Sequence, residues 1–555
     1  MKRIILFLIA TLTLLLLNAA CQKTQPRPPF LPTPEITPPP EMKWEVRTDY
    51  TNLTPYIPPH TSYSRLKPGS MPELIPDDYG MLLPYSSPGI LNDGSMRASQ
   101  YGLVTIDGMI VTDLVYDRVE RAYGYYMGVH TSRPAYRITI NDTGGESMFY
   151  FDNRQGACAL DGSWITSLDY LEVAFSEDLI LLIRDYNTND IDVYDYNGTL
   201  LYNTLELDWI KNISRDYWIG NLTYNLSEGY STVQMKDGTY AFINMLNGRA
   251  RYTEFTQADT FYEGMALVAV KDKDDWRSAE RYGFIDSSFE LVIPATYTSG
   301  SRFQNGYAVV ENPNGSMKII NKRGETKLTV QDGHYLDQTY DGTGFSVRSR
   351  DAWDLITLYT TDLVEFKPPA VLQDTSLSNQ CYSIGGGWYV CAVYEADSIV
   401  KPSGGRIDVV PGTYLFSPGR EYFFPGISHL SYADDEFMIF VEYDGVGYKT
   451  GVMRLDGGVI IPAEKDATIT AVAEDGNAIA FIITHSPGLS PRAARSSNTY
   501  RLVDTNGNTI TSGSGLMEYD EAAGLFSILG QDFFTWMDKS GNAFISIPLM
   551  SYTMD

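Results

Sequence analysis

A fixed spacing between a glycine, a turn residue and an aromatic residue recurs along this 555-residue chain. From Gly102 it is eleven residues to Asp113 and three more to Tyr116. The spacing recurs from Gly156 (then Ser167 and Tyr170) and from Gly283 (Pro294 and Tyr297). Two further copies are partial: from Gly451 it reaches Pro462 but has Lys465 at the aromatic position, and Ala241 takes the place of the glycine before Phe255. Such repetition constrains the fold more than any local signal, because each unit is one supersecondary element that must pack on its neighbours.

The period of the repeat is about 42 residues. Phe261, Gly264, Ala266 and Val268 are followed 42 residues later by Phe303, Gly306, Ala308 and Val310. Gly283 and Gly451 lie 168 residues apart, which is four periods. We count about ten units, several of them degenerate. This period is typical of a propeller or a solenoid.

The units are built from strands. Short β-branched and aromatic runs alternate with turn pairs, as in TIDGMIV, ALDGSWI, DYNGTLL, MKDGTYAF, RLDGGVII and DTNGNTI, and such pairs between strands predict hairpins. No long segment beyond Trp44 has apolar residues at helical spacing. We therefore predict an all-β fold of tandem antiparallel repeats, propeller-like, with an open β-solenoid array as the alternative because propellers usually have four to eight blades.

One strand carries two further expectations. In LVIPATY the apolar residues Leu291, Val292 and Ile293 are consecutive, which predicts a strand covered on both faces. Pro294 lacks an amide donor, so we expect it to end that strand.

The stretch from Arg281 to Glu311, RYGFIDSSFELVIPATYTSGSRFQNGYAVVE, resembles the WG-containing repeat of bacterial surface and secreted proteins, with Tyr in place of the namesake Trp. The clearest copies span 240–311. The resemblance implies a β-repeat body over 44–555 and a surface setting, and it supplies no catalytic residues. The copies are weakest over 324–408, so two subdomains divided there are an alternative to one body.

The N-terminus has the composition of an export signal. Lys2 and Arg3 precede fourteen apolar or small residues, too few to span a bilayer, and Ala19-Ala20-Cys21 follows. The segment resembles a bacterial lipoprotein signal, which implies cleavage of residues 1–20 and a lipid on Cys21. Eight of the fifteen residues from Pro26 to Pro40 are proline, so 21–43 should be an extended tether of roughly 45 Å. We expect a chain anchored in the lipid bilayer at the extracytoplasmic face of the cell membrane.

The composition argues against several classes of partner and site. With 69 acidic and 42 basic side chains the formal charge is −27, which argues against nucleic acid as a partner, since its binders present a basic face. Five histidines are spaced at least 56 residues apart, so no local His pair offers a metal site. No GxSxG elbow or phosphate-binding glycine loop is present in the sequence.

The segment from Lys271 to Arg281 interrupts the repeat, and loops of repeat proteins commonly carry binding residues. Its Asp272, Asp274, Asp275 and Trp276 are our candidate ligand contacts. No cofactor is required by any motif; the three aspartates offer oxygens for a calcium ion but lack EF-hand spacing.

Cys381 and Cys391 flank SIGGGWYV, with Gly386 at the midpoint. A hairpin centred on the glycines would place the two thiols opposite each other, and an exported chain could join them in a disulfide.

These observations favour a non-catalytic, envelope-anchored lipoprotein whose β-repeat body binds an envelope protein or a wall glycan. The alternative is an extracytoplasmic glycan-active enzyme that uses two carboxylates, although the sequence selects no pair of them.

Overall fold

The computed structural model describes residues 74–549 except 91–95, 127–128, 142–152, 177, 215–221, 223–225, 272–278, 340–341, 352, 374–379, 395–396, 401–405, 444, 475, 486–497 and 522. All of the described residues belong to one unit, Val46–Asp555. The predicted signal segment, Cys21 and the proline-rich tether lie outside the described residues.

The described residues form eleven small antiparallel sheets, which we number in chain order. Sheet 1 has β1 (Leu82–Ile90), β2 (Met96–Thr105) and β3 (Ile110–Tyr116); sheet 2 has β4 (Arg118–Tyr126), β5 (Val129–Asn141) and β6 (Asn153–Ala159); sheet 3 has β7 (Glu172–Phe175), β8 (Leu179–Asp185), β9 (Asp190–Asp195) and β10 (Leu200–Asn203). Sheet 4 has β11 (Tyr230–Gln234), β12 (Tyr240–Asn244) and β13 (Arg249–Tyr252); sheet 5 has β14 (Gln257–Tyr262), β15 (Met265–Val270), β16 (Arg281–Asp286) and β17 (Leu291–Tyr297).

Sheet 6 has β18 (Ser299–Gly300), β19 (Tyr307–Glu311), β20 (Met317–Asn321) and β21 (Thr326–Val330); sheet 7 has β22 (His334–Gln338), β23 (Gly344–Ser349), β24 (Leu355–Thr360) and β25 (Glu365–Phe366); sheet 8 has β26 (Tyr382–Gly385), β27 (Trp388–Val393), β30 (Gly412–Ser417) and β31 (Arg420–Pro425). Sheet 9 has β32 (Ile427–Tyr432), β33 (Phe437–Tyr443), β34 (Tyr448–Arg454) and β35 (Val459–Lys465); sheet 10 has β36 (Ala467–Glu474), β37 (Asn477–His485), β38 (Thr499–Asp504) and β39 (Thr509–Ser514); sheet 11 has β40 (Leu516–Asp520), β41 (Leu525–Leu529), β42 (Phe533–Met537) and β43 (Ala543–Pro548). A separate hairpin, β28 (Asp397–Val400) and β29 (Arg406–Val409), lies in the β27–β30 connection, and short 3-10 helices η2 (Thr204–Glu206) and η3 (Asp208–Asn212) follow sheet 3.

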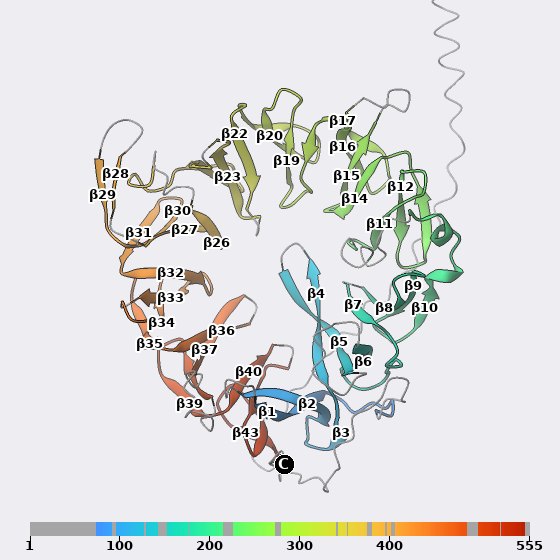
Figure 1. Cartoon of the computed structure of the whole chain (residues 1–555), viewed down its shortest axis with the longest axis vertical. Coiled ribbons are helices and arrows are strands. Elements are labelled where there is room, and N and C mark those ends of the chain that lie inside the picture. Colours follow the sequence, from blue (N-terminus) through green and yellow to red (C-terminus); the bar gives the residue numbers. More distant parts are fainter. Residues whose placement is uncertain are drawn as a thin grey trace, which may run out of the picture. The chain divides into compact units, whose positions relative to one another are not determined.

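The sheets stand in a ring, with the first strand of a sheet nearest the middle and the last at the periphery, as β7 with β10 and β36 with β39 illustrate (Figure 1). Sheets 1 and 11 meet, because β1 contacts β41 and β42 and the Trp536 indole donates to the Pro84 carbonyl at 3.2 Å. The propeller-like prediction is confirmed, with eleven described sheets where the repeat count gave about ten units.

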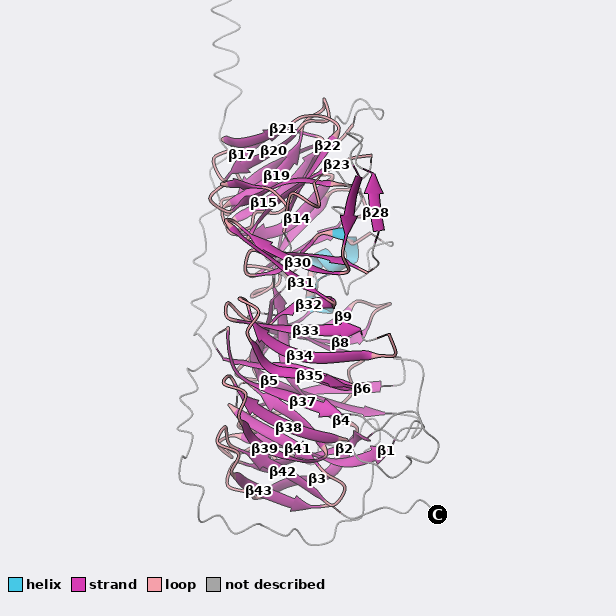
Figure 2. Cartoon of the chain, turned by 90° about the vertical axis from the view of Figure 1, so that its left-hand side faces the viewer, coloured by secondary structure: helices cyan, strands magenta, loops and turns pink. Residues whose placement is uncertain are grey.

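The two sides of the ring differ. In an antiparallel sheet the turn between strands one and two and the turn between strands three and four emerge at the same end, and we call this side of the ring the turn face. The connection between strands two and three emerges at the opposite side, where the β28–β29 hairpin stands out (Figure 2).

The sequence repeat is out of phase with the sheets. The two copies that match at 42 residues place Ala266 and Val268 in β15 and Ala308 and Val310 in β19, all four buried. The stretch Arg281–Glu311 therefore supplies the two outer strands of sheet 5 and the two inner strands of sheet 6. Each such copy ties two neighbouring sheets together through its own chain.

The constant spacing encodes a β-bulge in the outermost strand. Tyr282 pairs with Tyr297 and Phe284 with Ile293, so the register shifts at Gly283. A Cβ built on Gly283 would lie 2.5 Å from the Ile293 carbonyl oxygen. The same shift separates the partners of Tyr101 and Leu103 in sheet 1. Only glycine fits at the bulge, because backbone atoms of the bulged strand occupy the place where a Cβ would be.

Two expectations for LVIPATY were wrong, for one reason. Leu291 and Val292 are exposed and only Ile293 is buried, and β17 continues through Pro294. This strand is the outermost of its sheet, so one face meets solvent. Pro294 lies within the register shift opposite Gly283, where a residue without an amide donor is tolerated.

The turn pairs form hairpins as predicted. In DTNG the Asp504 carboxylate accepts the amides of Asn506 at 2.9 Å and Asn508 at 2.8 Å. Gly507 then has φ +88°, a left-handed conformation that favours glycine. The turn therefore follows from residues that are adjacent in the chain.

Apolar side chains fill the gaps between sheets. Phe242 of sheet 4 packs on Phe261 of sheet 5, with ring centroids 5.3 Å apart. Phe284 of sheet 5 meets Phe303, which follows β18, at 4.9 Å. All four rings are at most 1% exposed, and burying such a ring stabilises by about 1.5–3 kcal/mol. Stacking of neighbours thus supplies the core that a single unit lacks.

Carboxylates also link successive turns on the turn face. Glu263 accepts the amides of Asn305 at 2.5 Å and Gly306 at 2.9 Å in the next sheet's turn. Asn305 and Gly306 have φ of +53° and +80°, so their two N–H groups point the same way and form an anion-binding nest. Glu228 makes the equivalent contact with Gly264, at 3.0 Å.

Sheets 10 and 11 are joined by a similar link. Glu474, at the end of β36, accepts hydrogen bonds from the Tyr519 hydroxyl and pairs with the Lys539 ammonium. Burial alone would raise the pKa of Glu474, but these hydrogen bonds and the Lys539 charge outweigh it and hold the pKa below its ordinary value. The ionised carboxylate is thus favoured by the fold.

Candidate functional site

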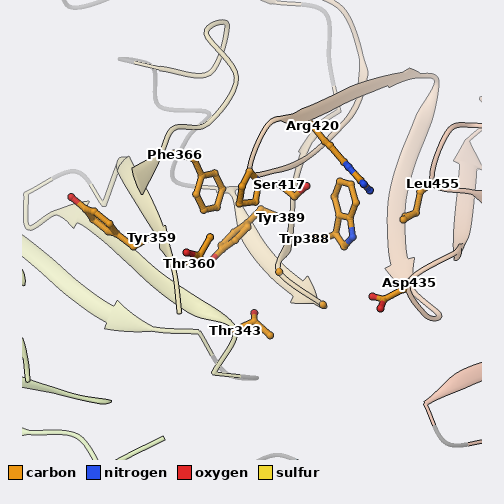
Figure 3. A pocket seen from close by; sticks show the side chains of 13 residues that line it. Thr343, Tyr359, Thr360, Phe366, Trp388, Tyr389, Ser417, Arg420, Asp435 and Leu455 are labelled. Carbon is orange, nitrogen blue, oxygen red and sulfur yellow. The ribbon is translucent and has the colours of Figure 1, made fainter. Parts of the chain in front are cut away.

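A cavity of about 520 Å³ opens on the turn face between sheets 7, 8 and 9 (Figure 3). Sheet 7 contributes Tyr359 and Phe366, sheet 8 contributes its β26–β27 and β30–β31 turns, and sheet 9 contributes Asp435. A volume of 300–1,000 Å³ is usual for small-molecule sites. The lining residues run from Thr343 to Leu455, segments far apart in the sequence that the ring brings together.

A turn of three consecutive glycines borders the cavity, and its Gly386 and Gly387 belong to the lining. Gly385, Gly386 and Gly387 have φ of +108°, +58° and +74°, conformations that other residues rarely adopt. A Cβ on Gly386 would lie 2.5 Å from the Tyr432 hydroxyl, whereas one on Gly387 would meet nothing within 4 Å. The turn therefore packs on Tyr432 from one side and leaves the cavity side open beside Trp388.

Aromatic rings form the wall. Trp388 and Tyr389 follow the glycine turn and are 5% and 3% exposed. Phe366 meets the Tyr389 ring edge-to-face with centroids 5.9 Å apart. Burial, with the Glu365 charge, raises the pKa of Tyr359, so its hydroxyl stays protonated and can donate. The rings are fixed by the core of sheets 7 and 8, which pre-organises the wall.

Two opposite charges lie at the rim. The exposed Arg420 guanidinium lies over the Trp388 ring, 6.0 Å from its centroid, a cation–π distance. Asp435, also exposed, accepts a hydrogen bond from Tyr432, which fixes its orientation. Thr343, Thr360 and Ser417 add hydroxyl groups to the lining. The cavity thus offers apolar rings together with donors and acceptors of hydrogen bonds.

The ligand contacts predicted from sequence are not among the described residues. Asp272, Asp274, Asp275 and Trp276 fall in 272–278, outside the described residues, and they stay a prediction. The described ends of that segment join β15 to β16, on the side of the ring opposite the turn face. Within the described part of the chain, no group of three or more His, Cys, Asp or Glu is placed to hold a metal ion.

The predicted thiol pair has the predicted register. Tyr382 pairs with Val390 in the β26–β27 hairpin, which sets Cys381 opposite Cys391. Both side chains are buried thiols here, and a hydrogen bond with Cys391, with burial, raises the pKa of Cys381. The juxtaposition is the one a disulfide needs, and the disulfide itself stays a prediction.

Sequence reasoning missed the cavity. It marked SIGGGWYV only as a hairpin between two cysteines, although three glycines before a tryptophan are a signal for an open turn beside a ring. Tyr359 and Phe366 of sheet 7 and Asp435 of sheet 9 carry no comparable signal, because they lie in other sheets than the glycine turn and only the ring brings them to it.

One of the comparisons with known proteins supports the repeat. None of the described helices is long and apolar enough to cross a membrane. No curated protein matches the sequence. Among solved structures, the chain is similar to a crystal structure of the eukaryotic initiation factor (TM-score 0.37, 8% identity, covering 78% of this chain and 95% of that one) and to BamB from Moraxella catarrhalis (TM-score 0.23, 12% identity, covering 67% and 100%). Residues 282–315 match the family model described as WG containing repeat, which supports the resemblance read from the same stretch of sequence.

Proposed function

We propose that this chain is a lipid-anchored protein of the extracytoplasmic face of the cell membrane, and that its ring binds an envelope glycan without chemical turnover. The lipoprotein-like segment ending at Cys21 and the proline-rich tether support the anchoring. The observation that carries the binding role is the turn-face cavity, whose lining combines aromatic rings and hydroxyl groups with one arginine and one aspartate.

A sugar ring suits such a lining. Its C–H faces are apolar and pack on aromatic rings, and its hydroxyl groups both donate and accept hydrogen bonds. Arg420 can donate two parallel hydrogen bonds, whereas Asp435 can accept them. The opposed charges cancel, so the cavity favours a neutral ligand within a chain that is otherwise strongly acidic.

The cavity argues for binding over hydrolysis. Glycosidases of the common types place two carboxyl groups about 5 to 10 Å apart across the scissile bond. The lining described for this cavity contains Asp435 as its only carboxylate, and that group already accepts a hydrogen bond from Tyr432. A glycan-active enzyme remains the alternative function, and its carboxylates would have to lie elsewhere.

Binding of solubilised envelope polysaccharide fragments to residues 44–555 tests the proposal. Arg420→Ala and Tyr359→Ala should each weaken binding about tenfold, about 1.4 kcal/mol, because the first removes a hydrogen-bond donor at the rim and the second removes an aromatic ring of the lining. Tyr252→Ala is the matched control, since Tyr252 is an exposed tyrosine of β13 that does not line the cavity. Equal binding by all variants would remove the cavity from the proposal, and capture of an envelope protein by the wild type, lost in Arg420→Ala, would replace the glycan with a protein partner.

Anchoring is tested separately. The full chain expressed in a bacterium should incorporate labelled fatty acid and partition into detergent, whereas Cys21→Ser should do neither. Labelling that survives in Cys21→Ser would contradict lipidation at this residue.

A further inference from the structure

A second cavity, of about 270 Å³, lies where the ring closes, between sheets 1, 2 and 11. Its walls come from β1, β2, β4 and the strands of sheet 11. Sheet 1 has three strands among the described residues, and its β2 and β3 occupy the third and fourth places of the repeat because β2 carries Gly102. The innermost place beside β1 is therefore not filled by a described strand.

The neighbouring inner strands meet across this place. Arg121 of β4 donates through one terminal nitrogen to both carboxylate oxygens of Asp520 in β40, at 2.9 Å each. The two side chains are 4% and 13% exposed. Their ion pair spans 399 positions of sequence, and both residues line the cavity.

The charges of the lining do not balance. Five charged side chains line the cavity, and four of them form pairs, Arg121 with Asp520 and Arg118 with Glu120, the latter at 2.7 Å. Glu518 has no hydrogen bond or ion pair with any described residue and is exposed to the cavity. Burial among the surrounding walls raises the pKa of Glu518, and the Arg118 charge opposes this only in part.

Aromatic rings line the same cavity as this carboxylate. Tyr101, Phe534 and Trp536 belong to the lining. Tyr101 and Glu518 line the same cavity, and burial, with the charge of Glu518, raises the pKa of Tyr101. The Trp536 indole is held by its hydrogen bond to Pro84. A carboxylate in a cavity lined by aromatic rings favours a positive charge, by Coulomb attraction and by the cation–π contact that the rings can add.

We propose that the cavity at the ring closure binds an alkylammonium group, with Glu518 as its counter-ion and the rings as its wall. A metal cation fits less well, because Ca²⁺ takes six to eight oxygen ligands and Glu518 is the one carboxylate here that is not already paired. An ammonium group can come from a free polyamine or from a lysine side chain of a peptide. This site is separate from the turn-face cavity, so either proposal can fail alone.

Titration of residues 44–555 with butylammonium, followed by calorimetry and by Trp fluorescence, tests the site. Wild type should bind at millimolar or lower concentration, and 1-butanol, which has the same length without the charge, should not. Glu518→Gln should weaken binding at least tenfold, about 1.4 kcal/mol. Asp337→Asn is the matched control, because Asp337 is also an exposed acid on the first strand of a sheet, outside this cavity, and it should leave the affinity unchanged.

Two further ligands separate the sources. If the natural ligand is a polyamine, spermidine should bind more tightly than butylammonium. If the natural ligand is a protein, a blocked lysine peptide should bind more tightly than butylammonium. Equal binding of 1-butanol, unchanged affinity in Glu518→Gln, or no binding of butylammonium at millimolar concentration would each overturn the proposal. Unaltered thermal unfolding of Glu518→Gln at the assay pH shows that a loss of binding is not a loss of fold.

Discussion

Gly283→Ala tests the role of the glycine that the repeat spacing preserves. The added Cβ would lie 2.5 Å from the Ile293 carbonyl oxygen and 2.7 and 2.8 Å from backbone atoms of Ala295. These neighbours are main-chain atoms of β17 and cannot rotate away as a side chain would. Overpacking of this kind costs about 1–3 kcal/mol, and we expect a cost near 3 kcal/mol here because the strand itself must move.

Hydrogen exchange locates and sizes this effect. Opening of β16 and β17 should become about 100-fold more frequent, since each 1.4 kcal/mol is a factor of ten. Gly447→Ala is the control: its Cβ would meet only Lys465 Cε, at 3.7 Å, so the smaller unfolded-state entropy should make it neutral or stabilising by about 0.4–1 kcal/mol. Exchange in Gly283→Ala that equals that of Gly447→Ala would refute the argument that strand crossing selects glycine.

Three other outcomes are expected. Arg121→Ala should lower the free energy of unfolding in urea by about 3–5 kcal/mol, because it leaves Asp520 poorly solvated and without its partner. The double variant with Asp520→Ala should lose less stability than Arg121→Ala alone, and a larger loss would contradict this. Glu474→Gln should lower the free energy of unfolding by about 1 kcal/mol at neutral pH. Because the pKa of Glu474 is lowered in the folded state, its contribution is present above pH 4.5 and is lost as the pH falls through the folded-state pKa. The stabilities of the two proteins should therefore converge in acid, and a constant difference across pH would exclude the ionised carboxylate as the cause. Protein exported to an oxidising compartment should carry a Cys381–Cys391 disulfide, seen as an intact mass lower by two hydrogen atoms than after reduction, and equal masses would show that the thiols persist.

The hairpin turns, the regular glycine-to-aromatic spacing of the strands and the all-β class could be predicted from the sequence because their causes are local. Asp504 and Gly507 form their turn within five residues. The number of residues between Gly283 and Tyr297 sets where β17 bulges and where it pairs again with β16. Each of these features depends on backbone geometry within about fifteen positions, so a spacing in the sequence records it.

Only the tertiary structure decided the number of described sheets, the exposure of Leu291 and the two cavities. Exposure of β17 depends on its outermost place in the sheet, which no residue of LVIPATY specifies. The turn-face cavity joins Tyr359, Trp388 and Asp435, and the pair at the ring closure joins residues 399 positions apart. Such contacts arise from how the units stack and where the ring closes, and a local pattern contains no record of either.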